Sequence, residues 1–193
     1  KPNFNYTDNT LSTSLSSTQT DNLSAYGYET SKTRFAIGTK FEQYENLFFT
    51  PNISTSYENL QTTSAASANL RKQEGKYVDT YFNYRLDYDK RDQSYQPTDG
   101  YRTTFTQELP VISNNYELAN SIEFSKYQKL LSDMVGKVTF YGKNINSLSD
   151  DKDVRISKRA FLAEKRLRGF EKGKVGPIDN GDFNVVNYLA SVN

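Results

Sequence analysis

Apolar residues alternate with polar ones along most of the chain, which is the period of a β-strand. Residues 77–88 show the pattern most clearly, because one face is apolar and the other is charged. The apolar face holds Val78, Thr80, Phe82, Tyr84, Leu86 and Tyr88, and the opposite face holds Asp79, Tyr81, Asn83, Arg85 and Asp87. The same split recurs in 33–41, 101–109 and 116–125. The pattern therefore predicts a chain of amphipathic strands.

The predicted strands are long for a β protein. They cover 9–19, 26–41, 46–60, 76–88, 100–110, 115–127, 132–142 and 182–193. Most have ten or more residues, more than the usual ~5–6 and close to the ~9–11 that a tilted strand needs to cross a bilayer. Strands of this length favour a transmembrane barrel.

The predicted connections differ in length. Those at 42–45, 110–115 and 128–131 are short, and those at 61–75, 89–99 and 143–181 are long. We expect the short turns on one rim and the long loops on the other, as in outer-membrane barrels. Ala65, Ala66, Ala68, Leu70 and Arg71 could form a short surface helix within 61–75.

Composition sharpens this interpretation. The 193 residues have a mean hydropathy of −0.79 and a net charge of +1, which fits neither a helical membrane protein nor a highly charged disordered chain. A barrel with a wet lumen needs an apolar residue only at every second position. Five tyrosines near strand ends would suit an aromatic girdle: Tyr77, Tyr88, Tyr101, Tyr116 and Tyr127. A soluble β-sandwich that binds sugars through its aromatic residues is the alternative.

The sequence offers little chemistry for catalysis. It contains no Cys and no His, which removes disulfides, thiolate nucleophiles and the commonest metal ligand. We expect no cofactor and no metal. The balance of 24 Lys and Arg against 23 Asp and Glu argues against nucleic acid. An enzyme is not expected, because Ser157, Lys158 and the scattered Asp/Glu pairs show no arrangement of nucleophile and base.

Two motifs lie on this strand pattern. The longest predicted loop, 143–181, contains the run Leu167, Arg168, Gly169, Phe170 and then Gly176-Pro177. Upstream, Asp87 leads through Pro97, Thr98, Asp99 and Gly100 into a strand. With both motifs in this order, the chain resembles the Omp85 superfamily of outer-membrane β-barrels, most closely its BamA branch. Ala163-Glu164 and Val185-Val186-Asn187 depart from glycine-rich family patterns.

The resemblance implies a fold and a function. It implies an all-β fold in which residues 1–193 form a partial barrel domain, about half of a 16-stranded antiparallel transmembrane barrel, with 143–181 folded into the lumen. It also implies an assembly factor that folds and inserts β-barrel proteins into the outer membrane of a Gram-negative bacterium. Its expected partners are unfolded barrel substrates, the lipid bilayer and, through POTRA domains absent from this segment, assembly lipoproteins. A TamA-like factor, a two-partner secretion transporter and a small complete barrel are alternatives.

Arg168 is the predicted anchor of the long loop. A guanidinium in a lumen lined by carboxylates would form charge-assisted hydrogen bonds. The candidate lumenal partners are Asp79, Glu108 and Glu123, and Asp87 is expected to line the lumen with them. Gly169 would allow a sharp turn, and Phe170 would pack against lumenal aromatic residues such as Tyr81.

Overall fold

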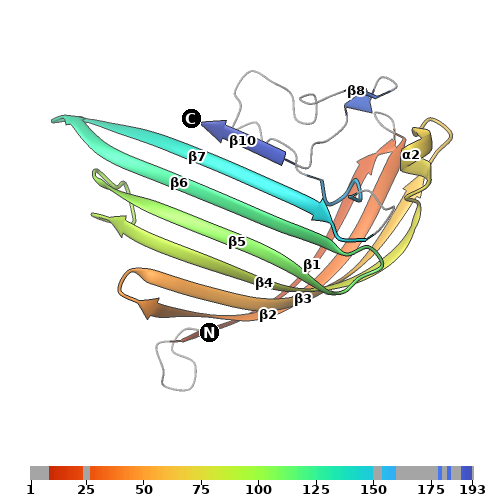
Figure 1. Cartoon of the computed structure of the whole chain (residues 1–193), viewed down its shortest axis with the longest axis horizontal. Coiled ribbons are helices and arrows are strands. Elements are labelled where there is room, and N and C mark those ends of the chain that lie inside the picture. Colours follow the sequence, from red (N-terminus) through yellow and green to blue (C-terminus); the bar gives the residue numbers. More distant parts are fainter. Residues whose placement is uncertain are drawn as a thin grey trace.

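The computed structural model describes residues 9–23, 27–149, 154–159, 178–179, 182–183 and 188–192. Within these residues the chain is one antiparallel sheet of eight strands, in the order β1-β2-β3-β4-β5-β6-β7-β10 (Figure 1). The strands are β1 (Thr10–Asn22), β2 (Tyr28–Tyr44), β3 (Leu47–Thr62), β4 (Gly75–Arg91), β5 (Gly100–Ile112), β6 (Glu117–Leu131), β7 (Met134–Ser147) and β10 (Tyr188–Val192). The short strands β8 (Ile178–Asp179) and β9 (Asp182–Phe183) pair with each other.

The all-β prediction is confirmed, and strands β1 to β7 are longer than expected. β2 and β4 each have 17 residues, and every neighbouring pair in the sheet is antiparallel. The eight strands form one sheet, whereas a sandwich packs two sheets face to face. Of the expected strand at 182–193, Tyr188–Val192 pairs with β7 and Asp182–Phe183 pairs with β8 instead, and residues 184–187 and 193 lie outside the described residues. No helix among the described residues is long and apolar enough to cross a membrane.

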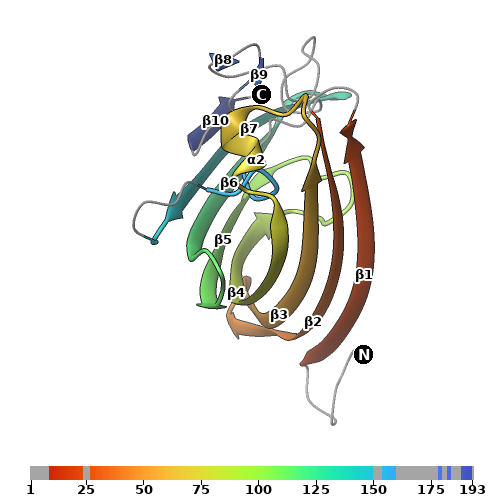
Figure 2. The same cartoon turned by 90° about the vertical axis from the view of Figure 1, so that its right-hand side faces the viewer.

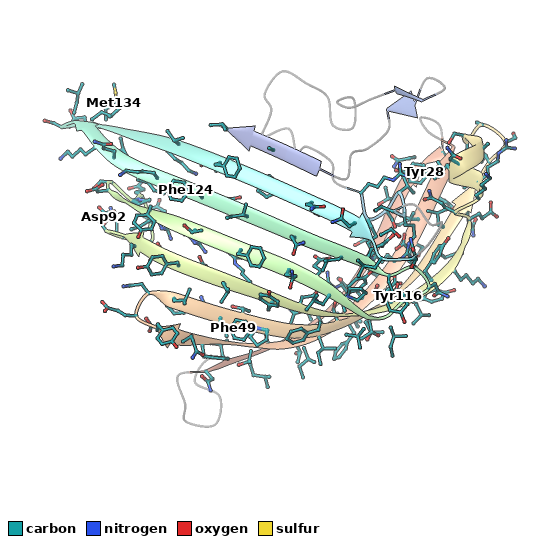
Figure 3. The ribbon with its side chains drawn as sticks, in the orientation of Figure 1. Tyr28, Phe49, Asp92, Tyr116, Phe124 and Met134 are labelled. Atoms are coloured by element: carbon teal, nitrogen blue, oxygen red, sulfur yellow. The ribbon has the colours of Figure 1, made fainter. Side chains whose placement is uncertain are left out.

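The sheet curves strongly, so that it has a concave and a convex face (Figure 2). The register of neighbouring strands aligns their apolar residues on one face, since Ile53 pairs with Phe82 and Leu86 pairs with Phe105. The opposite parity aligns polar residues, as Asn52 pairs with Asn83 and Asn83 with Glu108. Phe35, Ile53, Val78, Ile122, Phe124 and Phe140 on the convex face are each more than a third exposed. Figure 3 shows side chains projecting from both faces.

The rims differ from the expectation of short turns opposite long loops. The turn after β2, the loop 92–99 and the turn after β6 lie on one rim, because each follows an even-numbered strand of the meander. The opposite rim carries the connection 63–74, the short turn 113–116 and the segment that follows β7. The loop 92–99 and the turn 113–116 were therefore assigned to the wrong rims.

Of the five tyrosines expected in an aromatic girdle, two lie in described strands on the convex face, namely Tyr88 and Tyr101. Tyr88 and Tyr101 lie on the convex face with ring centroids 5.9 Å apart, and the Lys90 ammonium lies 5.7 Å from the Tyr88 ring. Tyr77 and Tyr127 have the opposite parity and belong to the concave face. Tyr116 precedes β6 in the turn 113–116. A position near a strand end is not sufficient, because parity decides which face a side chain occupies.

Small apolar clusters lie under the segments that cover the concave face. Helix α2 (Ala68–Arg71) confirms the expected short helix, with Ser67 accepting a hydrogen bond from the Leu70 amide at its start. Tyr28, Ala66 and Leu70 form one cluster, and Ile156 packs against it. Ile145 and Val154 form a second cluster. Residues 154–159 are thus held on the concave side by contacts at both Val154 and Ile156.

Candidate functional site

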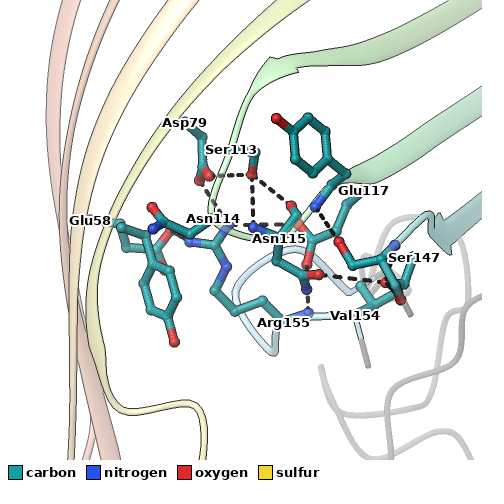
Figure 4. Close-up of polar contacts among 12 residues, drawn as sticks. Glu58, Asp79, Ser113, Asn114, Asn115, Glu117, Ser147, Val154 and Arg155 are labelled. Atoms are coloured by element: carbon teal, nitrogen blue, oxygen red, sulfur yellow. Dashed lines mark hydrogen bonds and ion pairs between the residues drawn. The ribbon is translucent and has the colours of Figure 1, made fainter. Parts of the chain in front are cut away.

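The best-defined polar site lies on the concave face, where three carboxylates from three strands surround one guanidinium (Figure 4). We call Glu58 on β3, Asp79 on β4 and Glu117 on β6 the acidic cluster. Their side chains are 0%, 0% and 2% exposed, and the side chain of Arg155 is 2% exposed. All three acidic residues have the polar parity of their strands, so the alternation of the sequence brings them to one face.

Arg155 contacts each member of the acidic cluster. Its Nη2 donates to Asp79 Oδ2 at 2.8 Å, and its backbone N–H donates to Glu117 Oε1 at 2.8 Å. The distance from Nη1 to Glu58 Oε2 is 3.8 Å, and that from Nη2 to Glu117 Oε2 is 3.7 Å. The guanidinium also lies 4.0 Å from the centroid of the Tyr77 ring. One residue therefore connects the segment after β7 to β3, β4 and β6.

Neighbouring residues orient the carboxylates. Ser113 Oγ lies 2.6 Å from Asp79 Oδ1, and the Asn115 side-chain amide donates to Glu117 Oε1 at 3.0 Å. The ammonium of Lys32 lies 3.4 Å from Glu58 Oε2, the oxygen that also faces Arg155. The turn 113–116 thus supports the cluster from one side and β2 supports it from the other.

The site combines electrostatic stabilisation with incomplete hydrogen bonding. Burial lowers the pKa of Arg155, but Glu117 and Asp79 outweigh it and raise that pKa overall, so the guanidinium stays charged. Glu58 Oε1, Glu117 Oε2 and Arg155 Nε are buried and form no hydrogen bond among the described residues. A buried charge network of this kind is weakened sharply when one partner is removed, because the others stay desolvated.

Lys158 is a second cation of the same segment. Its ammonium lies 4.1 Å from the Tyr81 ring centroid. Burial, followed by the positive charge of Lys32, lowers the pKa of Lys158 to about 8, while Glu108, Asp79 and Glu117 act in the opposite direction. The Tyr81 ring contacts Lys158, and Phe170, which is predicted to pack against this ring, lies outside the described residues.

The predicted site residues fall in three places. Leu167, Arg168, Gly169, Phe170, Gly176 and Pro177 lie outside the described residues. Asp79 lies in the acidic cluster, whereas Glu108 pairs with Asn83 and Glu123 pairs with Thr104 farther along the concave face. The Asp87 carboxylate accepts hydrogen bonds from both Nε (2.7 Å) and Nη2 of Arg102. The prediction that Arg168 pairs with one of these carboxylates stays a prediction.

The turn motif forms a closed loop at the rim opposite the acidic cluster. Asp92 accepts hydrogen bonds from the Thr98 hydroxyl (2.6 Å) and from the Asp99 amide (3.2 Å), and the Thr98 hydroxyl lowers the pKa of the Asp92 carboxyl. Pro97 lies inside this loop. Gly100 has φ +95°, and a Cβ there would lie 2.1 Å from the Lys90 carbonyl oxygen. Glycine is therefore required at this position.

Sequence reasoning missed Arg155, Glu58 and Glu117. The available signal was the run Val154-Arg155-Ile156, in which a cation lies between two apolar residues of an otherwise polar segment. The alternation of the sequence also places Glu58 and Glu117 on the polar faces of their strands. What could not be read was that these carboxylates meet Asp79 at one rim, because this depends on the register of four strands.

A single curved sheet with an apolar convex face and a charged concave face that receives a loop defines the wall of a membrane β-barrel. The chain belongs to the Omp85 superfamily, because the Omp85 superfamily domain model matches residues 1–188. Proteins of this superfamily are outer-membrane proteins that assemble or transport other proteins. No curated protein matches the chain in sequence.

The fold also matches a solved structure. The crystal structure of BamA from Haemophilus ducreyi lacking POTRA domains 1–3 superposes with a TM-score of 0.72 at 18% identity. The match covers 92% of this chain and 37% of that chain. At this identity the likeness shows the fold alone, and the chain spans little more than a third of the length of that BamA chain.

Proposed function

We propose that the protein carrying this chain folds and inserts β-barrel proteins into the outer membrane of a Gram-negative bacterium. Membership of the Omp85 superfamily supports this role, as does the fold that the chain shares with a BamA barrel. The observation that carries the proposal is a barrel wall whose polar face binds a loop through the buried Arg155.

The proposal places the chain within a larger barrel of about sixteen strands. A sheet that spans a membrane must close, because unpaired N–H and C=O groups at its edges cannot be satisfied in hydrocarbon. β1 and β10 form the two edges of the described sheet. We propose that further strands pair with them and that residues 1–193 form about half of the barrel domain. Its concave face is then the lumen.

The proposed partners follow from this role. Unfolded outer-membrane barrel proteins would be the substrates, and the lipid bilayer would contact the convex face. Lipoproteins of the assembly complex would bind through POTRA domains outside this chain. Substrate strands would pair with a strand edge that becomes exposed where the barrel closes only weakly, which is β-augmentation. Nucleic acid has no part in the proposal.

The Arg-Gly-Phe motif is a second element of the proposal. We propose that Arg168 also anchors the loop to lumenal carboxylates and that Arg168→Ala slows assembly. The measurement is the growth of cells that depend on the complete variant protein, together with protease resistance of the loop. Normal growth with a fully protected loop would remove this role from Arg168.

The proposed function is tested by reconstitution. The complete protein in phospholipid vesicles should accelerate the folding of a urea-denatured outer-membrane barrel, measured by the gel shift between folded and heated forms. Vesicles that contain an unrelated folded barrel are the control. Equal folding rates in the two vesicles would contradict the proposal, and export of a soluble passenger without barrel insertion would favour a transporter.

A further inference from the structure

Residues 155–159 form a hydrogen-bonded turn that carries the cations Arg155 and Lys158. Lys158 N donates to Arg155 O at 2.8 Å, and Arg159 N donates to the same oxygen at 3.1 Å. Side chains three residues apart in a helical turn are neighbours, roughly 5–6 Å apart at Cβ. Arg155 and Lys158 have this spacing. The turn therefore carries two cations, of which Arg155 contacts the Tyr77 ring and Lys158 contacts the Tyr81 ring.

The facing strand has matching groups at alternate positions. Tyr77, Asp79 and Tyr81 share the concave parity of β4, and alternate residues of a strand lie about 6.6 Å apart. The Tyr77 ring and Asp79 receive Arg155, and the Tyr81 ring receives Lys158. Asp79 and Tyr81, which receive Arg155 and Lys158, are alternate residues of β4, so their spacing is close to that of the two cations in the turn.

Two backbone contacts fix this turn in the same register. The Arg155 amide donates to Glu117 on β6, and the Ile156 amide donates to Gln73 Oε1 at 2.9 Å in the connection after α2. These contacts come from opposite sides of β4 in the strand order, since β5 and β6 follow it and the connection 63–74 precedes it. A shift of the turn by one residue would break both contacts and separate both cations from their rings.

We propose that Arg155 and Lys158 are positioning residues that register the loop after β7 against the Tyr77-Asp79-Tyr81 face of β4, independently of the Arg-Gly-Phe motif. This inference rests on the proposed function only for its consequence, namely that a loop in the wrong register slows substrate folding. The docked and released states are two discrete arrangements. Release would leave Asp79 and Glu117 without their shared guanidinium, so partial release is disfavoured.

Ser157 provides a direct probe of the docked state. Its hydroxyl is buried and has no hydrogen-bond partner among the described residues, so Ser157→Cys removes no such bond. The chain has no cysteine of its own. In the complete protein, with any other cysteines replaced, the rate of labelling by a membrane-impermeant maleimide measures how often the turn leaves the wall. This reading requires neither a substrate nor an assembly assay.

The expected labelling rates separate registration from general packing. In the Ser157→Cys background, Arg155→Ala should label at least about tenfold faster, because the acidic cluster loses its shared cation. Arg155→Lys keeps the charge without the planar guanidinium and should restore part of the protection. Tyr81→Leu should speed labelling, whereas Tyr81→Phe keeps the ring and removes only a buried hydroxyl that has no hydrogen-bond partner within bonding geometry among the described residues. Tyr81→Phe should therefore label within about twofold of the parent protein.

Folding of each variant is checked by its gel shift between unheated and heated samples. A folded Arg155→Ala protein with slow, unchanged labelling overturns the proposal. Equal acceleration by Tyr81→Phe and Tyr81→Leu also overturns it, because the ring would then have no part in docking. If Arg155→Ala does not fold, Lys158→Ala and Tyr81→Leu carry the same test. Faster labelling with an unchanged rate of substrate-barrel insertion would support the role of Arg155 and Lys158 in the register of the turn. It would overturn the proposed effect of that register on assembly.

Discussion

Two arginine–aspartate pairs on the concave face use the same chemistry in different surroundings. Arg102 and Asp87 come from adjacent strands, and their side chains are 35% and 9% exposed. Arg155 and Asp79 are 76 residues apart in the chain, with side chains 2% and 0% exposed. Strand pairing already holds the first pair together, whereas the second pair itself brings a segment to the wall. Burial therefore makes Arg155 the more sensitive residue of the two.

The largest effect is expected at the buried pair. Arg155→Met removes the cation and leaves Glu58, Asp79 and Glu117 desolvated, which should lower the free energy of unfolding by about 3–5 kcal/mol. Urea unfolding of the complete protein in lipid or detergent, monitored by the gel shift, measures this change. A loss below ~1 kcal/mol would mean that the buried pair behaves like an exposed one.

A smaller effect is expected where backbone geometry, and not charge, shapes the loop 92–99. Gly100→Ala places a Cβ against the Lys90 carbonyl at φ +95° and should cost about 1–3 kcal/mol. The same urea titration measures it. Because this change lies at the opposite rim, Ser157→Cys labelling should stay slow. Fast labelling would show that the two rims are coupled.

The partly exposed pair should contribute less still. Arg102→Ala should lower the unfolding free energy by about 1 kcal/mol or less, since solvent screens a pair of this exposure. Labelling of Ser157→Cys should be unchanged. If Arg102→Ala exposed the turn as strongly as Arg155→Ala, the distinction between local pairing and loop anchoring would fail.

The smallest effect is expected from pH near neutrality, because Lys158 is protonated there in both the docked and the released form. The docked Lys158 has a pKa of about 8, lowered from an ordinary value near 10.5, so the released form binds its proton more tightly. Docking should therefore be independent of pH below 8 and should strengthen as pH rises from 8 toward 10.5, by at most about tenfold per pH unit. Protease resistance of the loop between pH 7 and 9.5, compared with Lys158→Met, measures this dependence. Docking that weakens over this range only when Lys158 is present would contradict the sign.

The faces of the sheet were predictable from sequence because alternation depends on neighbouring positions only. Phe82 and Asp79 were assigned to opposite faces of β4, and the structure places them so. The strand ends were less predictable, since polar side chains occupy both faces near the rim, as at Asn59 and Lys76, and erase the alternation. Rim assignment failed for a different reason, because loop length does not reveal on which rim a connection lies.

The buried arginine was harder to predict than the faces. Arg155 acts through residues from three strands, and the register that brings these residues together is a property of the whole sheet. The prediction that Arg168 anchors the loop rests on the Arg-Gly-Phe motif. In the described residues, Asp79 is paired with Arg155. A local motif can name a family, but the partner of a long-range ion pair depends on tertiary structure.

The most direct test is a double-mutant cycle between Arg155 and Asp79, with Ser157→Cys labelling as the measure of docking. The variants are Arg155→Met, Asp79→Asn and the combination, each in the complete folded protein. If the pair anchors the turn, the second substitution adds little to the first, and the coupling energy should reach about 1.5–3 kcal/mol. Effects that add to within about 0.5 kcal/mol would show that the two residues act separately and would contradict the account.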